Sequence, residues 1–253
     1  MRITFLGTGT SQGVPVITCG CEVCTSSDPR NKRLRTSVLI ETDDKTFVID
    51  SGPDFRYQML RARVKDLDAI IYTHEHKDHI AGLDDIRPFN YLLNKTIDIY
   101  ADHRVQDALR REFNYIFSEV KYHGLPQIKL HTLTNEAFNI GNTSIQPLEI
   151  MHFRLPILGF RIGDFTYITD AKTISVETVE KIKGTKILVI NALQITEHIS
   201  HFTLAEAIDF AQEIGAEMTY LTHISHNLGL HEVVELNLPA GIKLAYDGLQ
   251  LEV

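Results

Sequence analysis

Three histidines and an aspartate lie within six residues, in the stretch His74-Glu-His76-Lys-Asp78-His79. Imidazole and carboxylate are borderline ligands that suit Zn, Mn, Fe or Ni. A catalytic ion commonly keeps three protein ligands, so four candidates at this spacing are too many for one open site. The stretch therefore indicates two metal ions close together. A polar surface loop is the structural alternative, but solvated loops rarely concentrate histidine in this way.

The three cysteines of the chain form a second cluster, Cys19-Gly-Cys21-Glu-Val-Cys24. Thiolates at this spacing are typical of a structural zinc site, which needs a fourth ligand. Because no fourth cysteine exists, the ligand must come from elsewhere, and His226 is the candidate. The alternatives are three free thiols, or one disulfide and one free thiol, since three cysteines cannot all pair within one chain.

Metal ligands need rigid elements to position them, and the sequence predicts many short strands. The histidine stretch directly follows one of them, Ala69–Tyr72. Apolar and β-branched runs predict the strands Arg2–Leu6, Ser37–Glu41, Thr46–Ile49, Ala69–Tyr72, Ile97–Tyr100, Ile128–Thr132, Ala137–Ile140, Thr143–Glu149, Leu158–Ile162, Phe165–Ile168, Ile187–Ile190 and Thr219–Leu221. Near the end of the chain, Leu244–Tyr246 and Leu249–Leu251 flank Asp247-Gly248, which predicts a hairpin.

Helical spacing of apolar residues is found at Arg104–Val120, Val176–Ile182 and Thr203–Ile214, and the last segment opens with a capping-box pattern. No Pro-, Gly- or Ser-rich linker divides the chain. We therefore expect one α/β domain over residues 1–253, with two sheets, outer helices, and most helices in the second half.

Composition excludes several classes of protein. The net charge of −8 argues against nucleic acid as a general partner. No apolar run approaches the roughly 18 residues that a membrane span requires, so no membrane partner is expected. The first residues lack the pattern of a signal peptide, and a cytoplasmic location is the expectation.

The histidine stretch resembles the metallo-β-lactamase superfamily. This resemblance implies a four-layer αββα sandwich with two mixed sheets. It also implies further ligands after later strands, and His152, Asp170 and His223 stand at those points. In the family pattern His74, His76 and His152 hold one metal, whereas Asp78, His79 and His223 hold the other. Asp170 bridges the two.

Further segments narrow the resemblance to one branch of the superfamily. They are Leu6–Pro15, the cysteine cluster, Asp50-Ser-Gly52, Gly82–Asn90 and Thr222-His-Ile-Ser-His226. Together they resemble the phosphodiesterase branch typified by the phosphoribosyl 1,2-cyclic phosphate phosphodiesterases of the carbon–phosphorus lyase pathway. The resemblance implies that His226 completes the cysteine site, that a catalytic histidine stands at His201, and that the chain forms a homodimer.

We assign catalytic roles to His201 and Asp78. His201 would donate a proton to the leaving oxygen or neutralise phosphate charge, and an ordinary loop histidine is the alternative. Asp50 follows a strand and is well placed to hold an imidazole of the histidine stretch, although it could merely shape the Ser-Gly-Pro turn. Asp85 and Arg87 are candidates for the pocket wall, where Arg87 would meet phosphate or form a structural salt bridge.

The expected function is hydrolysis of a small, in some cases cyclic, phosphodiester by a hydroxide that bridges two divalent ions, Mn or Zn, with Fe and Ni as further options. One structural Zn would fill the cysteine site. The alternatives are a tRNA 3′-end endonuclease, a glyoxalase II-like thioesterase and a non-enzymatic zinc-binding module. The sequence shows no basic insertion of the kind with which the endonuclease grips tRNA.

Overall fold

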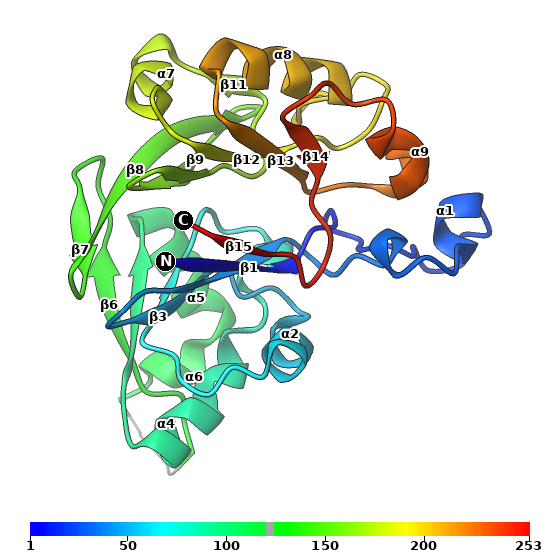
Figure 1. The fold of residues 1–253 in the computed structure, drawn as a ribbon. Helices are drawn as coiled ribbons and strands as arrows, with labels where there is room; N and C mark the ends of the chain where they lie inside the picture. Colours follow the sequence, from blue (N-terminus) through cyan, green and yellow to red (C-terminus); the bar gives the residue numbers. More distant parts are fainter. Residues whose placement is uncertain (120–123) are drawn as a thin grey trace.

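A computed structural model describes residues 1–119 and 124–253 of the chain (Figure 1). Its first sheet has seven strands in the order β15-β1-β2-β3-β4-β5-β6. These are Gln250–Glu252, Arg2–Gly7, Ser37–Glu41, Thr46–Ile49, Ala69–Ile71, Ile97–Ala101 and Ile128–Thr132. Strands β1 to β3 pair antiparallel, whereas β3 to β6 run parallel, so the sheet is mixed. The two ends of the chain meet in it, because β15 pairs with β1.

The second sheet follows the order β11-β8-β9-β10-β12-β13-β14, with β7 paired to β8. Its strands are, in chain order from β7, Phe138–Ile140, Thr143–His152, Leu155–Ile162, Phe165–Tyr167, Thr173–Ile174, Ile187–Asn191, Met218–Thr222 and Ile242–Leu244. It is mixed as well, since β8 to β10 are antiparallel and β10 to β14 parallel. The predicted strand Thr143–Glu149 thus continues to His152.

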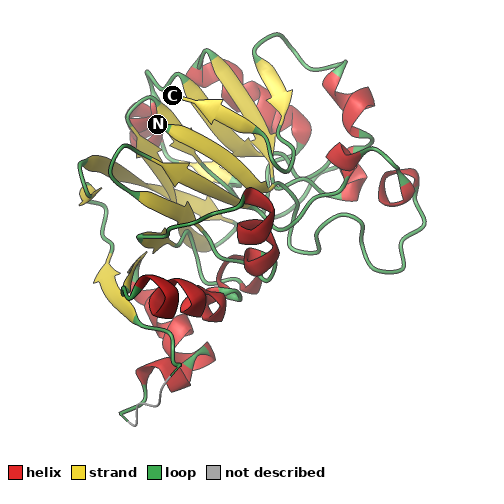
Figure 2. Ribbon diagram, turned by 60° about the horizontal axis from the view of Figure 1, so that its bottom comes forward, coloured by secondary structure: helices red, strands yellow, loops and turns green. Residues whose placement is uncertain are grey.

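The two sheets lie face to face, with helices on both outer faces (Figures 1 and 2). Buried side chains form a separate core at each of the three boundaries between layers. Phe5 and Phe160 lie in the core between the sheets. Phe55 and Leu109 pack under the first sheet, and Phe210 and Ile214 cover the second. This confirms the predicted four-layer α/β sandwich with two mixed sheets.

The helices that cover the first sheet are α2 (Phe55–Ala62), α4 (Arg87–Leu93), α5 (His103–Glu112) and α6 (Asn114–Phe117). Helices α7 (Val176–Ile182), α8 (Leu204–Ile214) and α9 (His231–Glu235) lie against the second sheet, and α1 (Glu22–Thr25) and α3 (Lys77–Ile80) are short. The expectation that most helices lie in the second half is therefore wrong. Helices of four to eight residues contain too few turns for their apolar periodicity to stand out.

Two predicted helices have different outcomes. The capping box of α8 is present: the Thr203 hydroxyl accepts from the Glu206 N–H at 3.2 Å, and Glu206 Oε2 accepts from the Thr203 N–H at 2.7 Å. The predicted helix Arg104–Val120 is instead interrupted at Phe113, whose φ and ψ of −119° and 43° are not helical. Its predicted end, Val120, lies outside the described residues.

The predicted hairpin around Asp247-Gly248 is also wrong. Strand β14 belongs to the second sheet and β15 to the first, so the turn connects the sheets instead of closing a hairpin. The reason is tertiary: Asp247 accepts hydrogen bonds from the Thr8 hydroxyl (2.8 Å) and the Leu34 N–H (2.9 Å). These contacts hold the turn against the start of the chain.

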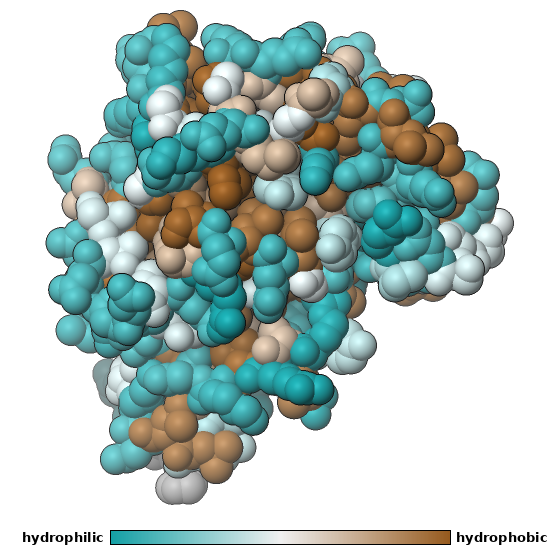
Figure 3. Space-filling model, in the orientation of Figure 1, coloured by the Kyte–Doolittle hydropathy of each residue, from teal (hydrophilic) through white to brown (hydrophobic). Residues whose placement is uncertain are grey.

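The surface of the molecule is largely hydrophilic on the face drawn in Figure 3. Hydrophobic residues reach this surface between the two sheets, near β1 and β15, over α9, and at the end that carries α4 and α6. Among the described residues, no helix is long and apolar enough to cross a membrane.

Candidate metal centre

The histidine loop begins where β4 ends, and it turns at once into helix α3. Thr73, His74 and His79 are buried, and His76 occupies the residue before the helix. His74 Nε2 lies 3.0 Å from His76 Nδ1, so these two rings converge. Gly52 permits the loop to approach so closely, since a Cβ there would lie 2.0 Å from the carbonyl oxygen of Asp78.

The other candidate ligands stand at the ends of three strands of the second sheet. His152 ends β8, Asp170 follows β10, and His223 follows β13 directly. Asp170 and His223 have φ angles of 57° and 55°, and Asp50, at the end of β3, has 65°. Left-handed backbone is costly for residues other than glycine, and it concentrates at functional sites. The strand ends are therefore shaped to turn these side chains inward.

The structure brings all seven predicted ligands together. The ligand atoms of His74, His76 and His152 all lie within 4.8 Å of one another. Those of Asp78, His79 and His223 form a second group that meets the same limit. Asp170 is close to both groups. Its oxygens lie 3.1 Å from His223 Nε2 and 3.4 Å from His79 Nε2 of the second group, and a carboxylate oxygen lies within 4.8 Å of the ligand atoms of His74 and His152 in the first group.

The donor atoms fit divalent cations. Three buried nitrogens, His79 Nε2 and both ring nitrogens of His223, form no well-aligned hydrogen bond with the described residues, although carboxylate oxygens lie 3.1 Å from the two Nε2 atoms. Buried polar atoms seldom remain unpaired in folded proteins, and an ion is one explanation where they do. Two groups of nitrogen and carboxylate donors, joined by Asp170, have the composition of a two-metal site.

Protonation states in the cluster also suit a metal. Burial lowers the pKa of His74 well below its usual value, and the neighbouring His79 lowers it further. Burial opposes ionisation of Asp170, but the imidazoles of His223 and His79 outweigh it and hold its pKa well below the usual range. Burial likewise opposes protonation of His79, yet Asp78, Asp50 and Asp170 raise its pKa well above the usual value. A divalent cation can take the place of the proton that these carboxylates attract.

Outer contacts orient the rings. Asp50 Oδ2 lies 2.7 Å from His79 Nδ1, as predicted for an aspartate that holds an imidazole of the loop. The Ser200 carbonyl lies 2.8 Å from His152 Nδ1, and the Thr73 hydroxyl lies 3.0 Å from His74 Nδ1. Such partners fix the tautomer and the direction of a metal-binding imidazole. Thr73 and Ser200 were not predicted, and their only sequence signal is that each adjoins a predicted site histidine.

His201 lies at the edge of this cluster, before helix α8. Its Nε2 atom is 3.0 Å from Asp170 Oδ1, and its Nδ1 atom is 3.0 Å from the Ser200 hydroxyl and 3.1 Å from His198 Nδ1. Burial lowers the pKa of His201 to about 4, although Asp170 acts in the opposite direction. His201 is therefore neutral near pH 7 and is held from both sides.

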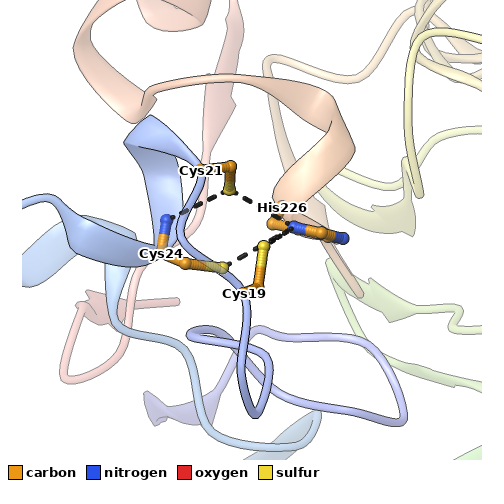
Figure 4. A group of neighbouring side chains, drawn as sticks. All are labelled: Cys19, Cys21, Cys24 and His226. Carbon is orange, nitrogen blue, oxygen red and sulfur yellow. Dashed lines mark hydrogen bonds between the residues drawn. The ribbon is translucent and has the colours of Figure 1, made fainter.

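The three cysteines and His226 lie together, although Cys19 and His226 are 207 positions apart in the sequence (Figure 4). His226 Nδ1 lies 3.3 Å from Cys19 Sγ, 3.4 Å from Cys21 Sγ and 3.6 Å from Cys24 Sγ. The N–H of Cys24 and the His226 ring lower the pKa of the Cys21 thiol, which favours the thiolate that binds zinc. Three thiols around one imidazole form a donor set of the structural zinc type.

The structure does not bring Asp85 and Arg87 to the metal ligands. Arg87 pairs with Asp84, the structural alternative considered from the sequence. It also lines a cavity of 680 Å³ that none of the candidate ligands borders. Asp85 borders another cavity, between α2 and α4. None of the candidate metal ligands borders either of these two cavities.

Comparisons with known proteins agree with this geometry. A sequence model of the Beta-lactamase superfamily domain matches residues 45–224. The crystal structure of a new diphosphatase from the PhnP family is 42% identical, with a TM-score of 0.93 and coverage of 100% of this chain and 97% of that one. Zinc-bound PqqB from Methylobacterium extorquens shares the fold at 17% identity, with a TM-score of 0.80 and full coverage of both chains.

Curated relatives carry several names. An octanoyltransferase of Porphyromonas gingivalis is 43% identical over 253 residues, which cover 99% of this chain and 51% of that protein. A ribonuclease Z of Acaryochloris marina is 30% identical over 65% of this chain and 48% of its own length. The chain thus spans about half the length of the curated relatives it matches. The family model, the sandwich fold and the clustered histidines and aspartates lead to one conclusion: this chain belongs to the metallo-β-lactamase superfamily.

Proposed function

We propose that the chain is a metal-dependent hydrolase that attacks phosphorus in small phosphodiesters, and also in the phosphoanhydride P–O–P linkage of diphosphate diesters. The observation that carries the proposal is the position of Asp170, between two three-residue donor groups and 3.0 Å from His201. Bound divalent ions would supply Lewis acidity and an activated water at neutral pH. The ions are Mn or Zn, with Fe and Ni also compatible with the donors.

Each residue then has a defined task. His74, His76 and His152 would hold one ion, Asp78, His79 and His223 would hold the other, and Asp170 would serve both. Asp50 keeps the Nδ1 proton on His79, so that Nε2 faces the ion. The cysteine cluster with His226 binds a structural zinc and fixes the N-terminal loop against the loop after β13.

His201 acts on the substrate. A neutral imidazole carries one N–H, and Ser200 and His198 hold the Nδ1 side of the ring. The Nε2 side faces Asp170 and the donor groups. From there it donates a hydrogen bond to a phosphoryl or leaving oxygen, which neutralises charge that develops during P–O cleavage.

The comparisons support attack at phosphorus. The structure that is 42% identical over the whole chain is a diphosphatase. A ribonuclease Z function is less favoured, because a net charge of −8 repels an RNA backbone. One observation favours a second candidate, thioester hydrolysis. The relative that is 43% identical is named an octanoyltransferase, and acyl transfer, like thioester hydrolysis, begins with attack on an acyl carbonyl carbon.

A substrate panel tests the proposal. The metal-loaded chain is assayed with bis(4-nitrophenyl) phosphate, a ribosyl cyclic phosphate, a nucleoside diphosphate sugar, a precursor tRNA and an octanoyl thioester. We expect turnover of the phosphodiesters and loss of that turnover in Asp170→Ala, with the fold intact by circular dichroism. Preferred cleavage of the thioester, or activity that survives Asp170→Ala, would overturn the proposal.

A second pair of variants tests His201. We expect His201→Ala to lower kcat about 10²- to 10⁴-fold while the metal content is unchanged, since the side chain acts on the substrate. His103→Ala is the matched control, because His103 is an exposed histidine at the start of α5. Equal losses in both variants would exclude a specific role for His201.

Elemental analysis separates the enzyme from a non-enzymatic zinc module. About three ions per chain are expected from two catalytic positions and one cysteine site. One ion per chain would support the module. Cys24→Ser should remove one zinc and leave the other two ions in place.

A further inference from the structure

A two-residue turn overhangs the candidate metal centre. Strands β8 and β9 pair up to His152 and Leu155, so Phe153 and Arg154 alone form the turn between them. Together with His76 and Ser200, these residues border an open cavity of 360 Å³. Two of the cavity residues, His76 and His152, are candidate metal ligands. The turn therefore borders the same cavity as two of the candidate metal ligands.

The turn is held firmly against the histidine loop. The Leu158 N–H donates to the Thr73 carbonyl at 3.0 Å, which joins β9 to the residue before His74. Arg104 donates to the Pro156 carbonyl and lies 3.8 Å from Glu75 of the loop. The tip of the hairpin therefore keeps a defined position relative to the metal ligands.

Phe153 is unfavourable for folding. Its φ of 56° lies in the left-handed region, which a two-residue hairpin turn usually fills with glycine, asparagine or aspartate. The residue is 45% exposed, so burial offsets only part of this strain. Backbone strain of this kind concentrates at active sites and ligand clamps.

The guanidinium of Arg154 forms no ion pair or side-chain hydrogen bond with the residues that the structure describes. It is exposed, and its one recorded contact within residues 1–119 and 124–253 is with the Phe153 ring, whose centroid lies 5.1 Å from the guanidinium carbon. Other cations near the centre are already paired: Arg104 faces Glu75, and Lys172 donates to Glu206 at 2.8 Å. The guanidinium donors of Arg154 are therefore available to a ligand, and the Phe153 ring lies beside them.

We propose that Phe153 and Arg154 form a recognition turn that binds a second anionic group of the substrate, beyond the phosphorus under attack. The inference rests on the proposed function and makes it narrower: it selects substrates with two charged groups, such as diphosphates, over singly charged diesters. Arg154 forms a fork of hydrogen bonds to the distal phosphate. Phe153 keeps the guanidinium in place and covers an organic part of the substrate.

Two substrates and a matched control test this inference. Bis(4-nitrophenyl) phosphate carries one charge, and a nucleoside diphosphate sugar carries one on each of its two phosphates. In Arg154→Gln we expect KM for the diphosphate to rise about 10- to 100-fold, because the variant loses a charge-assisted hydrogen bond to the substrate. The value of kcat should be nearly unchanged. KM for the singly charged diester should change less than about 3-fold. Arg110→Gln is the control, because Arg110 also lies over an aromatic ring, that of Phe117. It borders the 680 Å³ cavity, which none of the candidate metal ligands lines.

Two further measurements, ADP binding and the thermal midpoint of unfolding, do not require turnover. Calorimetric titration with ADP should show weaker binding to metal-loaded Arg154→Gln and unchanged binding to Arg110→Gln. Phe153→Gly should keep or raise the thermal midpoint, because it removes the strained φ, and should still raise KM for the diphosphate. A wild-type chain that cleaves neither substrate would contradict the proposed function, while ADP binding would still decide the role of Arg154. Equal KM and ADP affinity in Arg154→Gln and wild type would overturn the inference.

Discussion

Replacing Asp50 with asparagine should weaken metal binding without unfolding the chain. The Asp50 carboxylate is fully buried and accepts three hydrogen bonds. Its Oδ1 atom accepts from the Thr73 N–H at 2.9 Å. Its Oδ2 atom accepts from the Thr73 hydroxyl at 2.8 Å and lies 2.7 Å from His79 Nδ1. An amide of the same shape offers only one accepting oxygen.

Either orientation of the asparagine carries a cost. If the amide oxygen faces His79, the amide NH₂ meets the Thr73 N–H, and a buried donor loses its partner at about 1–3 kcal/mol. If the amide NH₂ faces His79, Nδ1 must accept, and the ring proton moves to Nε2. Because Nε2 is the atom directed at Asp78 and Asp170, that tautomer cannot bind an ion there.

We therefore expect Asp50→Asn to lower metal affinity about 10- to 100-fold, the usual effect of losing such a partner. The assay is competition with a chelator of known affinity, followed by elemental analysis and a thermal unfolding curve of the metal-free protein. Phosphodiesterase activity should be restored in part by excess metal.

Asp68→Asn is the matched control. Asp68 also accepts from a backbone N–H, that of Thr46 at 2.9 Å, and also contacts cations, but it stands before β4, at the opposite end of the strand from the histidine loop. We expect this variant to lose some stability and no metal affinity. If Asp50→Asn binds metal as tightly as wild type, or if Asp68→Asn loses equally, the assigned role of Asp50 is wrong.

Three further predictions concern the frame of the site. Gly52→Ala should lower the free energy of unfolding by about 2 kcal/mol or more and reduce the metal content, because its Cβ would lie 2.0 Å from the Asp78 carbonyl oxygen. The control is Gly163→Ala, whose Cβ would meet open space at a φ of 57°. It should lower the free energy of unfolding, measured in urea, by only about 1 kcal/mol. Burial, aided by the positive charge of Arg33, lowers the pKa of His231 in the folded chain to about 4. In the unfolded chain the pKa is about 6.5, so between pH 6.5 and pH 4 only the unfolded chain binds a proton at this residue. Stability should therefore fall between pH 6.5 and 4, and from pH 7 to 4.5 wild type should lose about 2 kcal/mol more than His231→Gln; parallel curves would contradict this. Thr203→Ala removes the cap of α8 and should cost about 1 kcal/mol, visible as a lower urea midpoint; an unchanged midpoint would show that the capping box contributes nothing.

Local sequence was sufficient wherever the chemistry lies in one short segment next to a strand. The histidine loop follows β4, and its spacing alone predicted the donor side chains that the structure brings together. The cap of α8 is equally local, because Thr203 and Glu206 are three residues apart. The order of the downstream ligands came from the family resemblance, and the strands that carry them came from apolar runs. All of these features depend on neighbours within one or two turns of chain.

Short helices and turns gave weaker signals. Helix α2 has eight residues with charged positions among them, and Asp54 makes no side-chain cap, so little in the sequence marks it. Asp247-Gly248 has the composition of a hairpin turn, yet it joins two sheets. Asp85 and Arg87 were predicted to line a pocket, and each borders a cavity, but neither cavity is lined by a candidate metal ligand.

The sequence by itself determined the donor atoms, their clustering in two segments and the alternation that builds two sheets. Tertiary structure decided which donors meet: Cys19 and His226 are 207 positions apart, yet their Sγ and Nδ1 atoms lie 3.3 Å from each other. It also placed the turn residues Phe153 and Arg154 beside the candidate metal ligands His76 and His152. The physical reason is that periodicity and spacing report on contacts along one element. The edges where two sheets converge depend on strand pairing between distant parts of the chain.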